Sequence, residues 1–144
     1  MSTIERKTVF DAQAVAATMH ALAVRTAVPL MDKGDLAAMV QANKDFAAAF
    51  AAEDAAAAMR ADDAFHGVAV VASRNEVIPG VLEQVTPVLR RLEFRRFSSL
   101  TGRQSIAQHK RIVSLCRRGD AEGAAQATQQ NWETLSLLID VEDL

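Results

Sequence analysis

Hydrophobic residues recur along the chain with the 3.6-residue period of α-helices, and polar or turn-forming residues separate the periodic segments. No stretch alternates with period two for long enough to indicate a strand. The pattern predicts six helices, at about residues 11–31, 35–50, 53–73, 75–97, 103–118 and 120–139. Short connections favour antiparallel neighbours, so we expect an all-α fold, a compact antiparallel bundle of about six helices.

Turn and capping residues set the expected boundaries of these helices. Asp11 and Asp120 are suited to N-caps, and Gly119 to the C-terminal stop before Asp120. Pro87 lies inside the fourth predicted helix, where the missing backbone donor should produce a kink. The segment 32–34, Asp-Lys-Gly, is expected to close the first helix.

Length and composition restrict the class of protein. At 144 residues a single domain, residues 1–144 with a core of about 11–139, is the simplest organisation. The net charge of −2 argues against a strongly basic nucleic-acid binder, and the lone Cys116 excludes an internal disulfide and a thiolate metal site. No export signal opens the chain, and the most apolar segment, 12–31, is too rich in alanine and polar residues for a membrane span. We therefore expect a cytoplasmic protein without a membrane partner.

The informative feature is a set of polar residues on the apolar helix faces. Asp62 and His66 are spaced i, i+4 and can address one point in space, while His109, Asn131 and His20 lie on the inward faces of three other helices. A buried polar group without a partner costs roughly 1–3 kcal/mol. These side chains are therefore expected to converge inside the bundle.

Two interpretations of such a cluster remain open from the residues alone. A carboxylate with imidazoles suits a borderline divalent ion such as Zn²⁺, Ni²⁺ or Mn²⁺. The same residues could instead be core groups that satisfy one another by hydrogen bonds, since a D-x-x-x-H pair on one helix is common by chance and an inward histidine is more often a satisfied core residue.

Four motifs in register carry a resemblance to a known family. They are Asp62-x-x-Phe65-His66, Ser73-Arg74-Asn75, Gln108-His109-x-x-Ile112-Val113 and Gly119-Asp120-Ala121-Glu122-x-Ala124. In this order and spacing, the chain resembles, from about residue 14 to 138, the FCD effector-binding domain at the C-terminus of many GntR-type (FadR-like) transcription regulators. The resemblance implies an internal ligand pocket that binds a small metabolite.

The resemblance also implies a metal-ligand set. Carried over position by position, it consists of Asp62, His66, His109 and Asn131, where metal-binding members of the family have a histidine in the last position. An amide oxygen is a poorer ligand for borderline cations than an imidazole, and some members work without metal. Gln108 similarly replaces the acidic residue that, in the family, usually precedes the histidine at the position of His109. One hypothesis is that His20 supplies the missing imidazole or binds the effector directly; the alternative is that its side chain only packs in the core.

Arg91 and Arg95 share one face of their predicted helix. Their guanidinium groups could hold the carboxylate of an organic-acid effector in bidentate fashion, as suits the organic acids to which many FCD regulators respond. The alternative is an ordinary solvated helix face.

The function expected from these observations and from the resemblance is that of a ligand-sensing effector domain without catalytic residues, a homodimer that binds a small organic acid. No room for a DNA-binding domain precedes residue 11, so direct DNA contact by this chain alone is not expected. Two alternatives remain: a small metal-dependent enzyme using the same pocket, and a metal-free structural interaction module. The enzyme is less favoured because the sequence offers no unclaimed inward carboxylate as a general base.

Overall fold

The computed structural model describes residues 2–98 and 100–135, without the side chains of residues 100 and 101, and this part of the chain is almost entirely helical. The helices are α1 (Thr3–Ala27), the short 3-10 helix η1 (Val28–Leu30), α2 (Lys33–Ala51), α3 (Ala55–Ala72), α4 (Ile78–Arg96), α5 (Leu100–Arg117) and α6 (Ala121–Glu133). The all-α class and the six-helix bundle are thereby confirmed.

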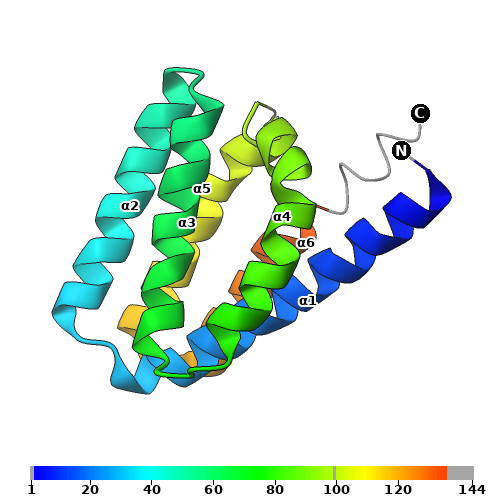
Figure 1. Cartoon of the computed structure of the whole chain (residues 1–144). Helices are drawn as coiled ribbons and strands as arrows, with labels where there is room; N and C mark the ends of the chain where they lie inside the picture. Colours follow the sequence, from blue (N-terminus) through cyan, green and yellow to red (C-terminus); the bar gives the residue numbers. More distant parts are fainter. Residues whose placement is uncertain (1, 99, 136–144) are drawn as a thin grey trace.

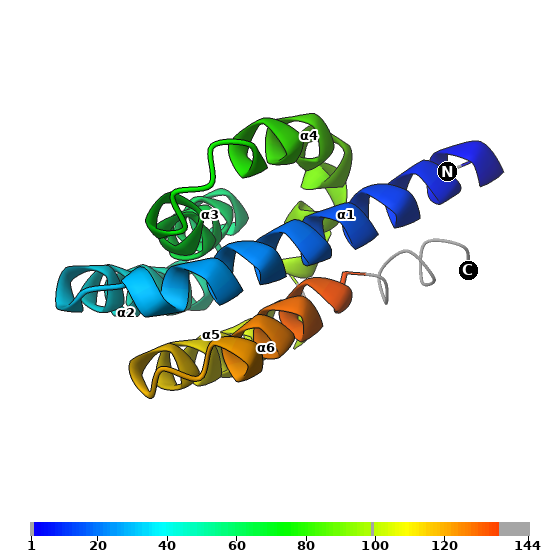
Figure 2. The ribbon, with the colours of Figure 1, turned by 90° about the horizontal axis from the view of Figure 1, so that it is seen from below.

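The helices are arranged around α1. Figure 1 shows α2 and α3 as an antiparallel pair, with α5 behind them. Seen from below in Figure 2, α1 runs between α3 and α4 on one side and α6 on the other, and it packs against all three. The inner face of α1 is built largely of alanines that are almost completely buried, which lets these neighbours approach closely.

The first helix begins eight residues before its expected start. Ser2, not Asp11, is its N-cap: the Ser2 hydroxyl accepts from the Glu5 amide, and the Glu5 carboxylate accepts from the Ser2 amide. This capping box satisfies two backbone donors at the helix start. The prediction that the helix begins at Asp11 is therefore wrong, although its signal, serine followed three residues later by glutamate, is present in the sequence.

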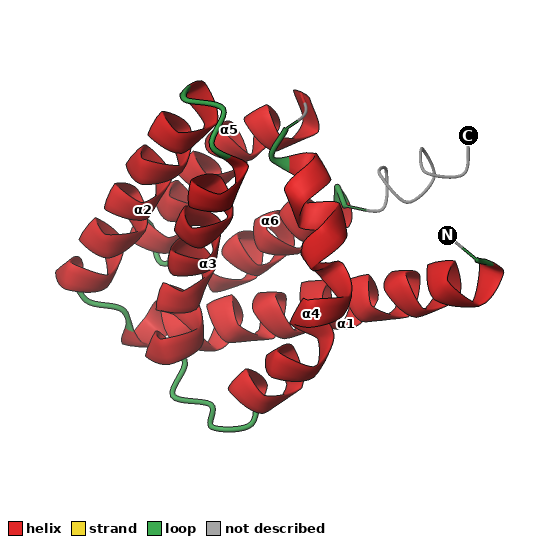
Figure 3. Cartoon of the chain, turned by 45° about the horizontal axis from the view of Figure 1, so that its top comes forward, coloured by secondary structure: helices red, strands yellow, loops and turns green. Residues whose placement is uncertain are grey.

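Other boundaries are closer to expectation. Asp32 opens α2 through a capping box with Asp35, rather than closing the helix before it. Asp120 caps α6 as predicted, after Gly119 in the left-handed conformation with φ of 75°. The helix α4 continues through Pro87, and its axis bends along its length (Figure 3). The expected end of the last helix, at residues 136–139, lies outside the described residues.

The apolar core occupies three neighbouring clusters. One joins α1, α2, α3, α5 and α6 around Phe65 and Ile112, the second joins α1, α4 and α6 around Leu92 and Trp132, and the third surrounds Phe46. Among the described residues, no helix combines the length and the apolar character that crossing a membrane requires.

Candidate metal centre

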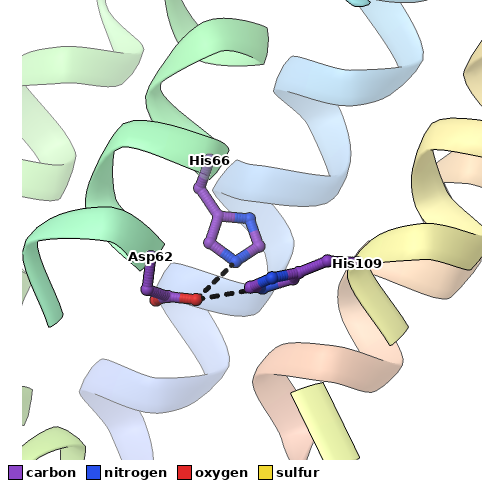
Figure 4. Close-up of side chains that lie close together, drawn as sticks. All are labelled: Asp62, His66 and His109. Carbon is purple, nitrogen blue, oxygen red and sulfur yellow. Dashed lines mark ion pairs between the residues drawn. The ribbon is translucent and has the colours of Figure 1, made fainter. Parts of the chain in front are cut away.

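Three of the predicted ligands meet inside the bundle. Asp62 and His66 lie one turn apart on α3, and His109 faces them from α5 (Figure 4). Oδ1 of Asp62 is 3.0 Å from Nε2 of His109 and 3.4 Å from Nε2 of His66. One ligand atom from each residue lies within 4.8 Å of the other two, and all three side chains are buried. The expected convergence of these three residues is thus present, and we call them the triad.

Asn43 on α2 determines which ring nitrogen of His109 carries the proton. Its Nδ2 donates to the carbonyl of Ile106 at 3.1 Å, which orients the amide so that Oδ1 faces Nδ1 of His109 at 2.9 Å. Because this amide oxygen can only accept, Nδ1 carries the proton and Nε2 of a neutral ring exposes its lone pair to Asp62. Phe65 stacks on the same ring, with 4.1 Å between the ring centroids, and fixes its plane.

The triad therefore contains an unfavourable contact between acceptors. Neither imidazole Nε2 makes a hydrogen bond, and Oδ1 of Asp62 makes none, although all three atoms are buried. A carboxylate oxygen 3.0 Å from an unprotonated nitrogen is repulsive unless a positive charge lies within reach of both. The donor chemistry of the triad consequently fits a divalent cation.

Electrostatics keep Asp62 and His109 in the ionisation states that metal binding requires. Burial lowers the pKa of His109 to about 4, against the opposing effect of Asp62, so its imidazole is neutral near pH 7. Burial alone would raise the pKa of Asp62, but the electrostatic effects of its neighbours, led by that of the adjacent His66, outweigh burial and hold this pKa well below its ordinary value. An ionised carboxylate and a neutral imidazole are the forms that bind metals.

His20 lies beside the triad rather than within it. Its ring is stacked on the indole of Trp132, with 4.4 Å between centroids, and its centroid is 5.3 Å from that of His66. Burial, together with His66, lowers the pKa of His20 to about 3. The triad forms the 4.8 Å ligand set without His20, so the hypothesis that His20 supplies the missing imidazole gains no support from this geometry.

Asn131 is completely buried on α6. Its Nδ2 donates to Oε1 of Gln108 at 2.5 Å and to the hydroxyl of Ser105 at 3.3 Å, while its Oδ1 has no hydrogen-bond partner. Gln108, which stands where the resemblance implies an acidic residue, thus orients the Asn131 amide. The role of Asn131 as a fourth ligand stays a prediction.

The arginines of α4 differ from expectation in their burial. Arg91 is exposed at a surface groove with the first turns of α1, and Arg95 is partly exposed. Arg96 is instead buried, donates to the hydroxyl of Ser105 and interacts electrostatically with Asp62. Effector binding by Arg91 and Arg95 stays a prediction, and Arg96 is the arginine of α4 that lies in the polar interior.

Glu93 is a buried carboxylate that the sequence analysis missed. Burial and the negative charge of Asp62 raise the pKa of Glu93 to about 7, while Arg90 donates to its Oε2 at 2.7 Å and opposes the shift. The expectation that no further carboxylate faces the interior near the site is therefore wrong. Asp63, which follows Asp62 in the sequence, is exposed instead and pairs with Arg90 at the surface.

Asn43 also escaped the sequence analysis, although a signal for it exists. It stands four residues after Met39 and three before Phe46, on the buried stripe of α2. The rule that selected His20, His109 and Asn131, a polar residue on an apolar helix face, selects Asn43 equally.

Comparison with known proteins gives one match. The model of the FCD domain matches residues 11–134. No curated protein and no solved structure matches the chain. FCD domains are the C-terminal effector-binding domains of GntR-type regulators, which are not enzymes. The match covers most of the chain and confirms the resemblance carried by the four motifs, so the protein belongs to the FCD family.

Proposed function

We propose that this FCD protein senses a small carboxylate-bearing metabolite through a divalent metal held by Asp62, His66 and His109. The coarser function, effector binding in the regulation of transcription, follows from the family. The metal and the carboxylate class of the effector are what the proposal adds. It places the protein in the cytoplasm as a homodimer, the arrangement expected from its sequence.

One observation carries the proposal. Two buried acceptor atoms, Oδ1 of Asp62 and Nε2 of His109, face each other at 3.0 Å, with Nε2 of His66 beside them. The hydrogen bond from His109 to Asn43 leaves no proton on Nε2 to relieve this contact. A mixed oxygen and nitrogen donor set of this kind suits Zn²⁺, Ni²⁺ or Mn²⁺. FCD domains are often metal-binding, which agrees with this donor set.

The fourth family position supports an effector that completes the site. The Oδ1 of Asn131 is buried without a hydrogen-bond partner, so it can act as a weak ligand or accept a hydrogen bond from the effector. When bound, the metal would supply a Lewis-acidic point that a carboxylate oxygen can coordinate. Arg96 adds a buried positive charge that favours an anion, because a guanidinium stays protonated even where burial lowers its pKa.

The regulatory step follows from the origins of these residues. The triad joins α3 to α5, Asn131 belongs to α6, and His20 approaches from α1. A ligand that contacts these residues together stabilises one packing of the four helices over others. The resulting population shift changes the surface through which a homodimer positions DNA-binding elements.

A metal-dependent enzyme is the second candidate, and Glu93 is the observation that favours it. A buried carboxylate with a pKa of about 7 has the property required of a general base. Its Oε2, however, accepts from Arg90, and the family consists of regulators. Turnover of a candidate metabolite by the metal-loaded protein would favour the enzyme.

The test combines elemental analysis with calorimetric metal titration of the purified chain. We expect one divalent ion per chain, and at least a tenfold loss of affinity in Asp62→Asn and in His109→Ala. Asp63→Asn is the matched control, because Asp63 is adjacent in sequence but faces the surface. A thermal-shift screen of small organic acids should then show stabilisation that depends on the metal.

The metal-free structural module makes the opposite prediction. In that case the purified protein contains no metal, the triad variants match the Asp63→Asn control, and no organic acid raises the melting temperature. This set of results would refute the proposed sensor.

A further inference from the structure

A second feature with binding chemistry lies on the other side of His109, at the surface between α2 and α5. It is a groove of about 230 Å³, lined by Val40, Asn43, Lys44, Lys110, Val113 and Arg117. Asn43 separates the two features, because it lines this groove while its Oδ1 faces Nδ1 of His109 at 2.9 Å. The opposite nitrogen of the same ring faces Asp62. We call this feature the α2–α5 groove.

Three positive charges meet in the α2–α5 groove. Lys44 comes from α2, and Lys110 and Arg117 lie two turns apart on one face of α5. All three side chains are exposed, and no ion pair or hydrogen bond joins any of them to another described residue. No acidic residue is among those that line the groove in the described part of the chain.

The neighbouring acidic residue does not neutralise these cations. Asp45 follows Lys44 on α2, but no ion pair joins its carboxylate to any of the three cations, and its Oδ1 accepts a hydrogen bond from Gln41 instead. The amide of Asn43 is likewise occupied by Ile106 and His109, so it does not compete for the lysine and arginine donors. The protein has a net charge of −2, which makes a local excess of three unpaired cations a deviation from its overall composition.

The size and charge of the groove define the ligand class. Pockets for drug-sized molecules are typically about 300–1,000 Å³, so this groove suits a smaller molecule. Three cations can satisfy two or more negative charges, and the arginine can bind a planar or tetrahedral oxyanion through two donors. A nucleic-acid backbone is a poor match, because its affinity grows with the number of phosphates that cations neutralise, and this groove offers three cations on a protein of net charge −2.

We propose that the α2–α5 groove binds a small multivalent oxyanion, held by Lys44, Lys110 and Arg117. The chemistry is shared by phosphate groups and by compact polycarboxylates, and it is independent of the metal at the triad. The site would give the protein a second ligand, bound next to the residue that orients His109.

The experiment uses the full chain after treatment with a chelator, so that its result does not depend on the proposed metal. Isothermal titration calorimetry at constant ionic strength measures binding of inorganic phosphate in one arm and of citrate in the other. We expect saturable binding of at least one probe. Its affinity should fall at least tenfold in the double variant Lys110→Gln/Arg117→Gln.

The matched control is Arg111→Gln/Arg118→Gln, which removes the same charge from exposed positions of the α5 region that do not line the groove. This control should retain the affinity of the unmodified chain. Lys44→Gln, on the other helix, provides a second groove variant should the double variant fold poorly. Absence of binding in both arms, or an equal loss in groove and control variants, would overturn the proposal.

Discussion

Asn43 offers the sharpest test of how the interior is organised, because one amide connects the backbone of α5 to the triad. Asn43→Ala removes two hydrogen bonds, one to Nδ1 of His109 at 2.9 Å and one to the carbonyl of Ile106 at 3.1 Å. Nothing else in the described residues accepts from Nδ1, so the change leaves a buried ring nitrogen unsatisfied, as a donor while the proton stays on Nδ1 and as an acceptor once it moves to Nε2.

The structure sets the size of the expected effect. Each lost hydrogen bond contributes about 0.5–1.5 kcal/mol, and leaving a buried donor without a partner costs about 1–3 kcal/mol. Asn43 is 6% exposed, so water replaces only part of the loss. We therefore expect Asn43→Ala to lower the free energy of unfolding of the metal-free protein by about 2–4 kcal/mol.

Metal binding supplies the second measurement. Without the acceptor, His109 is free to rotate or change tautomer, and loss of such an orienting partner typically reduces metal affinity 10–100-fold. Asn43→Asp keeps an acceptor at this position and should retain the affinity. Urea unfolding and calorimetric metal titration of both variants provide the data. If Asn43→Ala binds metal as tightly as the unmodified chain, the argument that Asn43 fixes the tautomer of His109 is refuted.

Two further predictions concern groups beside the triad. The raised pKa of Glu93, about 7 against an ordinary 4.5, means that the folded state keeps its proton longer, so the contribution of Glu93 to stability is present below about pH 4.5 and disappears as the pH rises through 7. Between pH 5 and pH 8 the unmodified protein should lose roughly 3 kcal/mol of unfolding free energy through this group, and Glu93→Gln should not show this loss. Urea unfolding of both proteins at the two pH values measures it, and the same pH dependence in both proteins would contradict the prediction. His20→Ala should leave metal stoichiometry and affinity unchanged in the calorimetric titration, because the triad forms a ligand set without His20, whereas lost metal would show that this ring is a ligand.

Helix periodicity identified which faces are buried, and with them most of the candidate site. Asp62 and His66 were selected because residues four apart share a helix face, and this relation holds whatever the helix packs against. His109 and Asn131 were selected because a buried face must satisfy its polar groups, and both are completely buried. These inferences depend on local geometry, which a single sequence encodes directly.

Helix starts were predicted less well, since they depend on which of several suitable caps is used. Ser2 and Asp11 can both cap the first helix, and only the reciprocal bond from Glu5 distinguishes them. Adjacent arginines were harder still. Arg95 and Arg96 differ by one position, a rotation of about 100° around the helix, and only Arg96 continues the buried stripe of Leu89 and Leu92.

The interior contacts between helices lay beyond the sequence because they depend on the relative rotation of two elements. Asn43 was visible as a polar residue on an apolar stripe, but nothing local indicated that α2 would place its amide against His109 of α5. That contact gives the triad its chemistry, since it removes the proton that would otherwise join His109 to Asp62. Motif spacing can therefore identify the ligands of such a site, while the tautomer of one of them, His109, is set by a residue from a helix outside the motifs.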